Sequence, residues 1–400
     1  MTRLFRAVII FSAIICLTID RSHGQVLAGI DVLVRDNFAA LNGARVGLIT
    51  NQTGTDYRGK STVEHFRNGT NFELVALFSP EHGFAGTLDQ AAIGDSQDEA
   101  TGLKIYSLYG ETRVPTKEML DGIDTLVFDI QDIGTRFYTY ISTMGGAMRA
   151  AAEHHIQFVV LDRPNPINGV TVQGPVLDGG SESFVGYHTL PVRHGMTVGE
   201  LARMFRSDWS LNVDMTVITI EGWDRESMFD ASGRLWINPS PNMRSLTQAV
   251  LYPGIGLLET TNLSVGRGTD TPFEIVGAPW IDAVDFAAAL NSRSLPGVAF
   301  VARQFTPDAS KYKDELCGGV NILVTDRSNF DPLRTGLAVA VVLHELYPVD
   351  WDTRSLNRLL SNQRCFEGIL AGRTVDELTS DYQQDLKAFL DRRQEMLLYQ

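Results

Sequence analysis

The sequence predicts an α/β protein, with a Rossmann-like domain built on a mostly parallel sheet and a smaller C-terminal α+β domain. The first observation is that short apolar segments of strand length alternate with helical segments at the spacing of βαβ units. The second is length, because 400 residues exceed what one hydrophobic core usually serves. The third is that this alternation loosens beyond residue 170. We therefore expect a Rossmann-like domain at 25–245 and a second domain at 246–400 that closes a cleft between the two.

The composition and the first residues predict an exported globular protein. Hydrophobic residues make up 44% of the chain and charged residues 20%, which is ordinary for a folded protein. Arg3 and Arg6 precede an apolar stretch at 7–18, and Ser22-His23-Gly24 places small residues before a cleavage point, as in a signal peptide. A retained signal anchor is the alternative. We expect a signal peptide at 1–24 and a periplasmic or secreted mature chain without stable membrane insertion.

Charge, cysteines and missing motifs exclude several classes of partner. A formal charge of −14 without a basic stripe argues against a nucleic-acid partner. No predicted strand leads into a G-x-G-x-x-G or P-loop motif, so no nucleotide is expected. Beyond the leader, Cys317 and Cys365 are too few for a disulfide framework or a zinc site, although one bridge between them stays open. We expect neither a cofactor nor a metal.

The elements of the first domain follow from apolar runs bounded by turn residues. Ser61 with Glu64, and Thr197 with Glu200, have the spacing of a helix capping box, so helices are expected to begin there. Residues 85–103 are polar and are expected to form a loop over the site. In order we expect a helical patch at 37–41, a strand at 45–50, a helix at 61–66, strands at 74–78 and 103–110, a helix starting at 116–120, a strand at 125–130, a helix at 144–155, a strand at 158–161, a helix at 197–209 and a strand at 215–220.

The second half of the chain has a different pattern. A proline-rich segment at 236–243 is interpreted as a hinge, and a glycine-punctuated loop is expected at 252–269. A helix from 284, strands near 298–304 and 319–325, and helices after 332 complete the prediction of an α+β domain.

Polar residues follow four of the predicted buried strands. Because parallel strands bring their carboxyl ends to one edge of a sheet, and ligands bind in the crevice beyond that edge, these endings are expected to converge on a site. The endings are Thr50-Asn51, Pro80-Glu81-His82, Asp129 to Asp132, and Asp162-Arg163.

Glu81 is the leading candidate for acid–base chemistry, with His82 beside it. A carboxyl group pressed by apolar neighbours such as Phe84 can have its pKa raised toward neutrality. Asp129 and Asp132 are candidates for the second carboxylate that glycoside hydrolysis normally needs. The alternatives remain a capping or supporting role for the two aspartates and a structural role for His82.

The predicted substrate-binding residues are polar or aromatic side chains near the same edge. Arginine binds a carboxylate bidentately, which would suit an acidic substrate, although an ordinary salt bridge is its more common role. Tyr138 is placed to stack on a sugar ring, with core packing as the alternative. The residues assigned to substrate binding are Asn51, Arg136, Tyr138, Arg163, Asn165, Glu259, Asn262 and Arg267.

Five blocks together resemble the bacterial exo-β-N-acetylmuramidases of the NamZ type. They are Gly47-Leu48-Ile49-Thr50-Asn51-Gln52-Thr53-Gly54, Ser79-Pro80-Glu81-His82-Gly83-Phe84, the segment 128–140, Asp162-Arg163-Pro164-Asn165-Pro166, and the segment 259–269. The likeness covers most of the mature chain.

The resemblance implies a glycoside hydrolase that releases terminal β-1,4-linked N-acetylmuramic acid from the non-reducing end of peptidoglycan fragments such as MurNAc-GlcNAc saccharides. It implies a Rossmann-like catalytic domain, a smaller C-terminal domain and a site between them, with Glu81 as the favoured catalytic residue. The lactyl carboxylate of this sugar would give the arginines a partner. Its acetamido group could itself attack, and the mechanism stays open. The alternatives are another cell-wall hydrolase (esterase or amidase) and a non-catalytic periplasmic sugar-binding protein.

Overall fold

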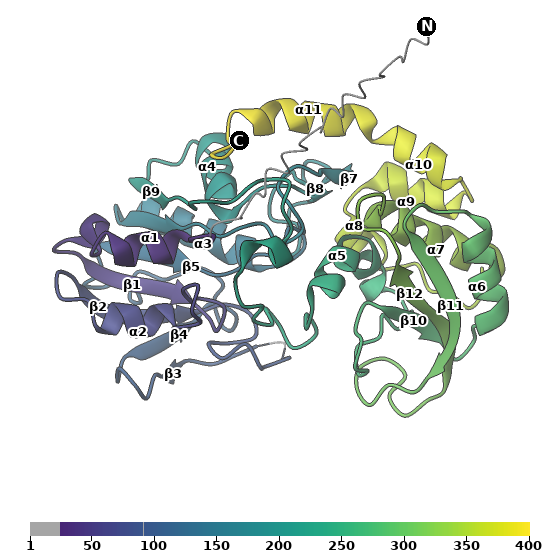
Figure 1. Cartoon of the computed structure of the whole chain (residues 1–400), viewed down its shortest axis with the longest axis horizontal. Helices are drawn as coiled ribbons and strands as arrows, with labels where there is room; N and C mark the ends of the chain where they lie inside the picture. The colour runs from purple at the N-terminus through teal and green to yellow at the C-terminus, as the bar shows by residue number, and fades with distance from the viewer. Residues whose placement is uncertain (1–24, 91) are drawn as a thin grey trace, which may run out of the picture.

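The larger domain is built on a seven-stranded sheet in the order β3-β4-β2-β1-β5-β6-β9 (Figure 1). The computed structural model describes residues 25–90 and 92–400, so the predicted signal peptide at 1–24 lies outside the described residues. Strand β3 is antiparallel to β4 and the other pairs are parallel, which confirms the predicted mostly parallel sheet. The strands are β1 (Arg45–Thr50), β2 (Glu73–Ser79), β3 (Ser96–Gln97), β4 (Lys104–Ser107), β5 (Thr125–Asp129), β6 (Gln157–Leu161) and β9 (Met215–Ile218).

Both faces of this sheet are buried because side chains alternate between two cores. Val127 of β5 packs with α1 (Gly29–Arg35) and α2 (Thr62–Arg67) on one face. Phe128, the next residue, packs on the other face with α3 (Tyr140–Glu153) and α4 (Val198–Asp208). Strands that are apolar on both sides in this way are typical of a parallel sheet between two helical layers.

Capping signals place two helices correctly. The Ser61 hydroxyl accepts a hydrogen bond from the Glu64 amide at 3.1 Å, at the start of α2. Thr197 and Glu200 form a reciprocal capping box at the start of α4. At α2 only the Ser61 half of the predicted box forms, because the Glu64 carboxylate pairs with Lys60 at 3.4 Å. Both caps satisfy backbone donors that the first helical turn leaves without partners.

Several element predictions are wrong. The helix expected from 116–120 is a single turn, because the chain reverses at Gly122, whose φ of +74° ends it. Of the helical patch predicted at 37–41, only a 3₁₀ turn, η1 (Ala39–Leu41), is present. It follows helix α1 in the chain, which was not predicted. The glycine-punctuated loop begins as helix α5 (Leu246–Ile255) and continues as η3 (Gly256–Thr260), with Pro253 inside α5. The polar segment 85–103 contains the short edge strand β3.

The smaller domain is α+β, as predicted. Its antiparallel sheet has the order β10-β12-β11, formed by β10 (Ile275–Ala278), β11 (Val298–Phe305) and β12 (Cys317–Val324). The helices around it are α6 (Ala283–Ser292), α7 (Pro332–Leu346), α8 (Asn357–Leu360), α9 (Gln363–Leu370) and α10 (Val375–Asp381). Cys317 and Cys365 are buried free thiols, so the bridge between them does not form.

Helix α5 lies directly against α7. A Cβ atom on Gly254 would lie 1.7 Å from the carbonyl oxygen of Pro332, so the two backbones meet at a glycine. We propose on this contact that α5 belongs to the smaller domain, which keeps the predicted boundary at 245/246.

The last helix carries the chain back to the larger domain. Helix α11 (Gln383–Gln394) runs across the top of Figure 1, and the C-terminus lies beside α4. The guanidinium of Arg203 donates to the carbonyl of Met396 at 2.9 Å, and the Leu398 amide donates to Glu200 at 2.9 Å. The Tyr399 hydroxyl donates to Asp162 at 2.5 Å. This C-terminal tail, residues 395–400, therefore fastens the two domains together.

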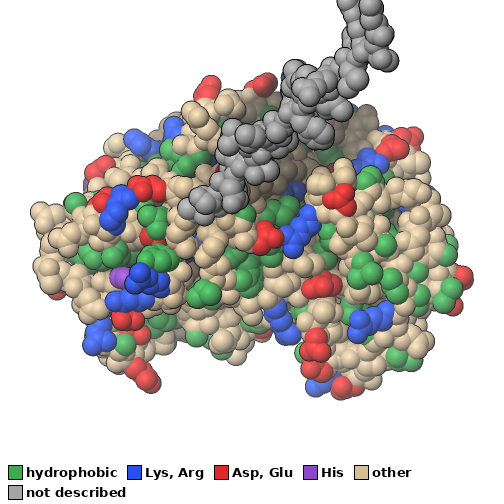
Figure 2. Space-filling model, in the orientation of Figure 1, with side chains coloured by type: hydrophobic (Ala, Val, Ile, Leu, Met, Phe, Trp, Pro, Cys, Tyr) green, Lys and Arg blue, Asp and Glu red, His purple; other side chains and the backbone are tan. Residues whose placement is uncertain are grey.

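Two smaller features complete the fold. Strands β7 (Gln173–Val176) and β8 (Pro191–Arg193) form a separate ribbon, and η2 (Phe229–Ser232) precedes the proline-rich segment. None of the helices within residues 25–90 and 92–400 combines the length and the apolar character needed to cross a bilayer. On the face drawn in Figure 2, acidic and basic side chains of the described residues are interspersed.

Candidate active site

A cavity of about 330 Å³ lies between the two domains at the carboxyl edge of the large sheet. Its wall on the larger domain comes from the segments that follow β2, β4 and β5, including Glu81, Tyr109 and Thr139. Its wall on the smaller domain includes Tyr252 and Arg267. This is the crevice that the parallel topology predicts, and strand endings from three places converge on it.

A hollow of about 670 Å³ lies elsewhere, against α4, and is less suited to chemistry. Most of its charged groups are already engaged: His188 lies 2.8 Å from Asp208, and the Arg149 guanidinium stacks 4.0 Å from the centre of the Trp209 ring. It also lies away from the strand endings, so the cleft cavity is the candidate site.

Glu81 is held at the cavity by a tight turn and a hydroxyl donor. Pro80 follows the end of β2, and both His82 and Gly83 have positive φ, of +69° and +76°. The Thr139 hydroxyl donates to the Glu81 carboxylate. Burial, together with the Glu81 charge, raises the pKa of Tyr109 to about 12, so this phenol stays protonated beside the carboxylate. Glu81 thus faces the cavity with neutral donors around it.

The hydrogen bonding of His82 fixes which ring nitrogen is free. Its Nδ1 atom lies 2.7 Å from the carbonyl oxygen of Leu88. A carbonyl only accepts, so Nδ1 carries the hydrogen, and the neutral ring keeps a lone pair on Nε2. Within the described part of the chain Nε2 has no hydrogen-bond partner. His82 can therefore accept a proton or a hydrogen bond from a molecule in the cavity.

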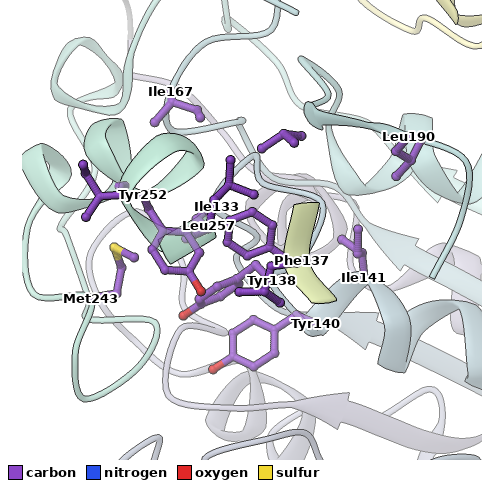
Figure 3. Close-up of a cluster of buried hydrophobic side chains, with 14 of the residues drawn as sticks. Ile133, Phe137, Tyr138, Tyr140, Ile141, Ile167, Leu190, Met243, Tyr252 and Leu257 are labelled. Atoms are coloured by element: carbon purple, nitrogen blue, oxygen red, sulfur yellow. The ribbon is translucent and has the colours of Figure 1, made fainter. Parts of the chain in front are cut away.

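Three buried tyrosines form an aromatic floor (Figure 3). The rings of Tyr138 and Tyr140 meet edge to face at 5.0 Å, and those of Tyr138 and Tyr252 at 5.9 Å. Their hydroxyl ends lie on the same side of the cluster in Figure 3. Burial raises the pKa of all three, which keeps them neutral. Only 7%, 1% and 8% of Tyr138, Tyr140 and Tyr252 are exposed, and the Tyr140 hydroxyl donates to the carbonyl of Pro239. Tyr138, predicted to stack on a sugar, is therefore packed in the core and supports the cavity wall.

An ion-pair bridge closes one side of the cavity. Arg267 of the smaller domain donates to Glu259 and, at 2.5 Å, to Asp89 of the larger domain. Burial alone would lower the pKa of Arg267, but the two carboxylates outweigh burial and raise it. The predicted residues Glu259 and Arg267 thus line the cavity while binding one another.

Asp129 and Arg163 lie side by side beneath the sheet edge and are not among the residues that line the cavity. Asp129 accepts from Nε of Arg163 at 2.6 Å and from its Nη2 at 2.9 Å, and from the Thr62 hydroxyl. The side chains of Asp129 and Arg163 are 0% and 3% exposed. Because the Asp129 carboxylate and the Arg163 guanidinium bind one another in this buried ion pair, neither group is free to bind a substrate in this arrangement.

Asp132 and the predicted asparagines also hold the backbone around the site. Asp132 accepts from the Gly134 amide at 2.7 Å and lies 3.3 Å from His194. Asn165 donates to the Met196 carbonyl at 2.9 Å, and the side-chain oxygen of Asn51 accepts from Thr53. Asn262 bridges to the 350–352 segment of the smaller domain, donating to a carbonyl at 2.8 Å. None of these four lines the cleft cavity as the structure describes it.

The chain matches two family models, one after the other along the sequence. Residues 46–247 match the model described as exo-beta-N-acetylmuramidase NamZ, N-terminal, and residues 250–399 match its C-terminal counterpart. The chain belongs to the exo-β-N-acetylmuramidase NamZ family.

Two kinds of relative support this membership. The peptidoglycan beta-N-acetylmuramidase NamZ of Bacillus subtilis (strain 168) is 45% identical over 379 residues, which cover 94% of this chain and 92% of that protein. Two crystal structures of DUF1343 family proteins from Bacteroides fragilis NCTC 9343 have the same fold. They superpose with TM-scores of 0.87 and 0.76 at 38% and 32% identity, and each comparison covers 94% of this chain and 99% of that chain.

Arg136, although it lies in one of the blocks that resemble this NamZ family, points away from the cavity. Its guanidinium is fully buried and donates to four backbone carbonyls: Pro175 at 3.0 Å, Leu190 at 2.9 Å, Leu359 at 2.8 Å and Leu360 at 2.6 Å. Burial lowers the pKa of Arg136, and carbonyl oxygens, which can only accept, favour its charged form. Arg136 therefore ties the larger domain to α8.

Some cavity residues were not among the sequence-based assignments. Tyr109 lies just past the end of β4 and Thr139 in the segment after β5, so the strand-edge rule could have identified both. Asp89 lies in the loop expected to cover the site. Tyr252 and Arg358 come from helices of the smaller domain, and no local pattern in the sequence indicates which of their faces meets the cleft.

Proposed function

We propose that this protein is an exo-acting glycoside hydrolase that releases terminal β-1,4-linked N-acetylmuramic acid from the non-reducing end of peptidoglycan fragments, with Glu81 as the principal acid–base residue. Membership of the NamZ family supports the activity. The observation that carries the residue assignment is the position of Glu81, whose carboxylate faces a cavity walled by both domains and accepts a hydrogen bond from Thr139.

The reaction divides naturally between the two residues of the β2 turn. The carboxylic acid of Glu81 gives its proton to the oxygen of the leaving sugar as the bond from that oxygen to the anomeric carbon breaks. Thr139 and the protonated Tyr109 hold the carboxylate as it gains charge. The free Nε2 of His82 accepts a proton from the attacking water or a hydrogen bond from a sugar hydroxyl.

Neither Asp129 nor Asp132, the candidates predicted from the sequence, is placed to act as the second carboxylate of a two-carboxylate mechanism. Asp129 is paired with Arg163, Asp132 holds the Gly134 amide, and neither lines the cavity. Asp89 and Glu259 do line the cavity, but both are paired with Arg267. This favours attack on the anomeric carbon by the acetamido group of the substrate or by a water that His82 activates. NMR of the first-formed sugar separates the two, because acetamido attack gives retained configuration and direct water attack gives inverted configuration.

We also propose that the mature protein works outside the cytoplasm, in the periplasm or secreted. The support is the pattern of residues 1–24, a basic start followed by an apolar stretch and small residues. Fractionation of expressing cells tests this, and a precursor-sized protein retained in the cytoplasmic fraction would contradict it.

The decisive experiment compares a chromogenic β-N-acetylmuramide with the matching N-acetylglucosaminide. We expect release from the first, and we expect Glu81→Gln to lower turnover by several orders of magnitude while leaving the fold intact. Glu99→Gln, which neutralises an exposed carboxylate outside the cavity, is the matched control. Near-normal turnover in Glu81→Gln would refute the role of Glu81. Release from neither compound would favour a sugar-binding protein or another wall hydrolase.

A further inference from the structure

Among the described residues that line the cavity, the charged groups leave one arginine without a carboxylate partner. The acidic side chains that line it are Glu81, Asp89 and Glu259, and the basic ones are His82, Arg267 and Arg358. Arg267 binds both Asp89 and Glu259, so its planar fork is occupied. Arg358, in contrast, makes no ion pair with a carboxylate among residues 25–90 and 92–400. It is the guanidinium that a negatively charged substrate group can reach without breaking an existing pair.

The backbone that carries Arg358 is fixed on both sides. The next two carbonyls in the chain, those of Leu359 and Leu360, accept from the buried Arg136 at 2.8 and 2.6 Å. Before it, the carbonyl of Ser355 accepts from the Thr260 hydroxyl at 2.8 Å. A long flexible side chain therefore projects from an anchored helix, α8, and binding a ligand requires only its own rotamers to be ordered.

The charge of Arg358 also acts at the catalytic side of the cavity. Burial and Glu81 raise the pKa of Tyr109, and the positive charges of Arg113 and Arg358 oppose that rise. Arg113 is stacked on aromatic rings, 5.2 Å from the centre of Tyr109 and 4.3 Å from that of Phe184. Arg358 thus lies within electrostatic reach of the tyrosine that neighbours Glu81, on the opposite domain.

We propose that Arg358 is the specificity residue that binds the lactyl carboxylate of the terminal N-acetylmuramic acid. This inference rests on the proposed function. N-acetylmuramic acid differs from N-acetylglucosamine by a lactyl group, which ends in a carboxylate, and a guanidinium can bind that carboxylate bidentately. The three arginines first expected to do this are engaged elsewhere, Arg136 with carbonyls, Arg163 with Asp129 and Arg267 with its two carboxylates.

The test compares three chromogenic substrates: the β-N-acetylmuramide, its lactyl amide, which has nearly the same shape without the charge, and the N-acetylglucosaminide. We expect Arg358→Gln to lower kcat/KM for the carboxylate substrate by about tenfold to a hundredfold, mainly through KM, as expected for loss of a charge-assisted hydrogen bond. Little change is expected with the amide or the N-acetylglucosaminide. Arg358→Lys should recover part of the loss, because it keeps the charge without the fork.

The control is Arg354→Gln, four residues earlier in the chain. Arg354 is 88% exposed, pairs with Asp352 and does not line the cavity, so all three rates should stay at the wild-type value. An equal loss with all three substrates in Arg358→Gln, or no loss with any, would overturn the assignment of Arg358.

Binding measurements keep this inference separate from the proposed function. Calorimetric titration with free N-acetylmuramic acid and with N-acetylglucosamine should show tighter binding of the acid by the wild-type protein and loss of that preference in Arg358→Gln. If no substrate is hydrolysed but this preference is seen, the glycosidase proposal fails and the carboxylate site stands. If hydrolysis occurs and the variant keeps its preference, the carboxylate site fails.

Discussion

The first prediction is that Arg136 stabilises the folded protein and does not bind substrate. The sequence predicts that Arg136 binds substrate, whereas its guanidinium donates to four buried carbonyls from both domains. Arg136→Met keeps the length of the side chain and removes the donors. A buried acceptor left without a partner costs about 1–3 kcal/mol. Four such oxygens give an expected loss in the free energy of unfolding of about 4 kcal/mol or more, a large part of a typical total of about 5–15 kcal/mol.

Urea unfolding followed by tryptophan fluorescence measures this loss, and Arg136→Lys is the second variant. Lysine keeps the charge but not the fork, so we expect an intermediate loss of stability with KM unchanged in the folded fraction. A free energy of unfolding within about 1 kcal/mol of wild type, smaller than the cost of one unpaired buried group, would refute the structural role. A raised KM at unchanged stability would restore the substrate-binding role.

Three further predictions concern stability. Asp129→Asn leaves the buried Arg163 charge without its partner, and we expect a loss of about 3–5 kcal/mol in urea unfolding; a loss under about 1 kcal/mol would contradict the pairing. Burial raises the pKa of Asp162 to about 7, so the folded state binds its proton more tightly than the unfolded chain, with a pKa of about 4. Stability should fall as pH rises from about 4 to 7, by up to about 4 kcal/mol from this group, and thermal scans of Asp162→Asn should show a smaller fall; an identical profile would refute it. Gly254→Ala should cost about 1–3 kcal/mol by forcing α5 off α7, whereas Gly179→Ala, in open space, should not; equal stability of the two variants would contradict the close contact.

Much of the large domain follows from local sequence. Apolar runs with residues on both sides buried predict a parallel sheet, and the parallel sheet predicts which strand endings share an edge. Thr50 pairs with Asp129 in the register of β1 and β5, so the predicted convergence is correct at the level of the backbone. The Pro80-Glu81-His82-Gly83 turn could be assigned to the cavity because its backbone geometry is local.

Convergence alone does not determine which side chains stay free. Asp129 and Arg163 end adjacent strands, and the same proximity that suggested a shared site allows them to neutralise one another. Arg136 finds acceptors in residues 175, 190, 359 and 360, a set that only tertiary packing brings together. The sequence also does not indicate Arg358 as a binding residue. Its availability depends on having no carboxylate partner among the described residues, and only the tertiary structure shows this.

The C-terminal tail has a consequence for biosynthesis. The last strand of the large sheet ends at Ile218, so every strand of that sheet has left the ribosome long before Tyr399 is made. Until then Asp162 lacks the hydroxyl that the finished chain supplies, and the Glu200 carboxylate lacks the Leu398 amide. A nascent or truncated chain therefore has a less stable larger domain, because it lacks the hydrogen bonds from Leu398 and Tyr399. These bonds form only once translation is complete. Shortened products should accordingly be the first to be cleared by proteases.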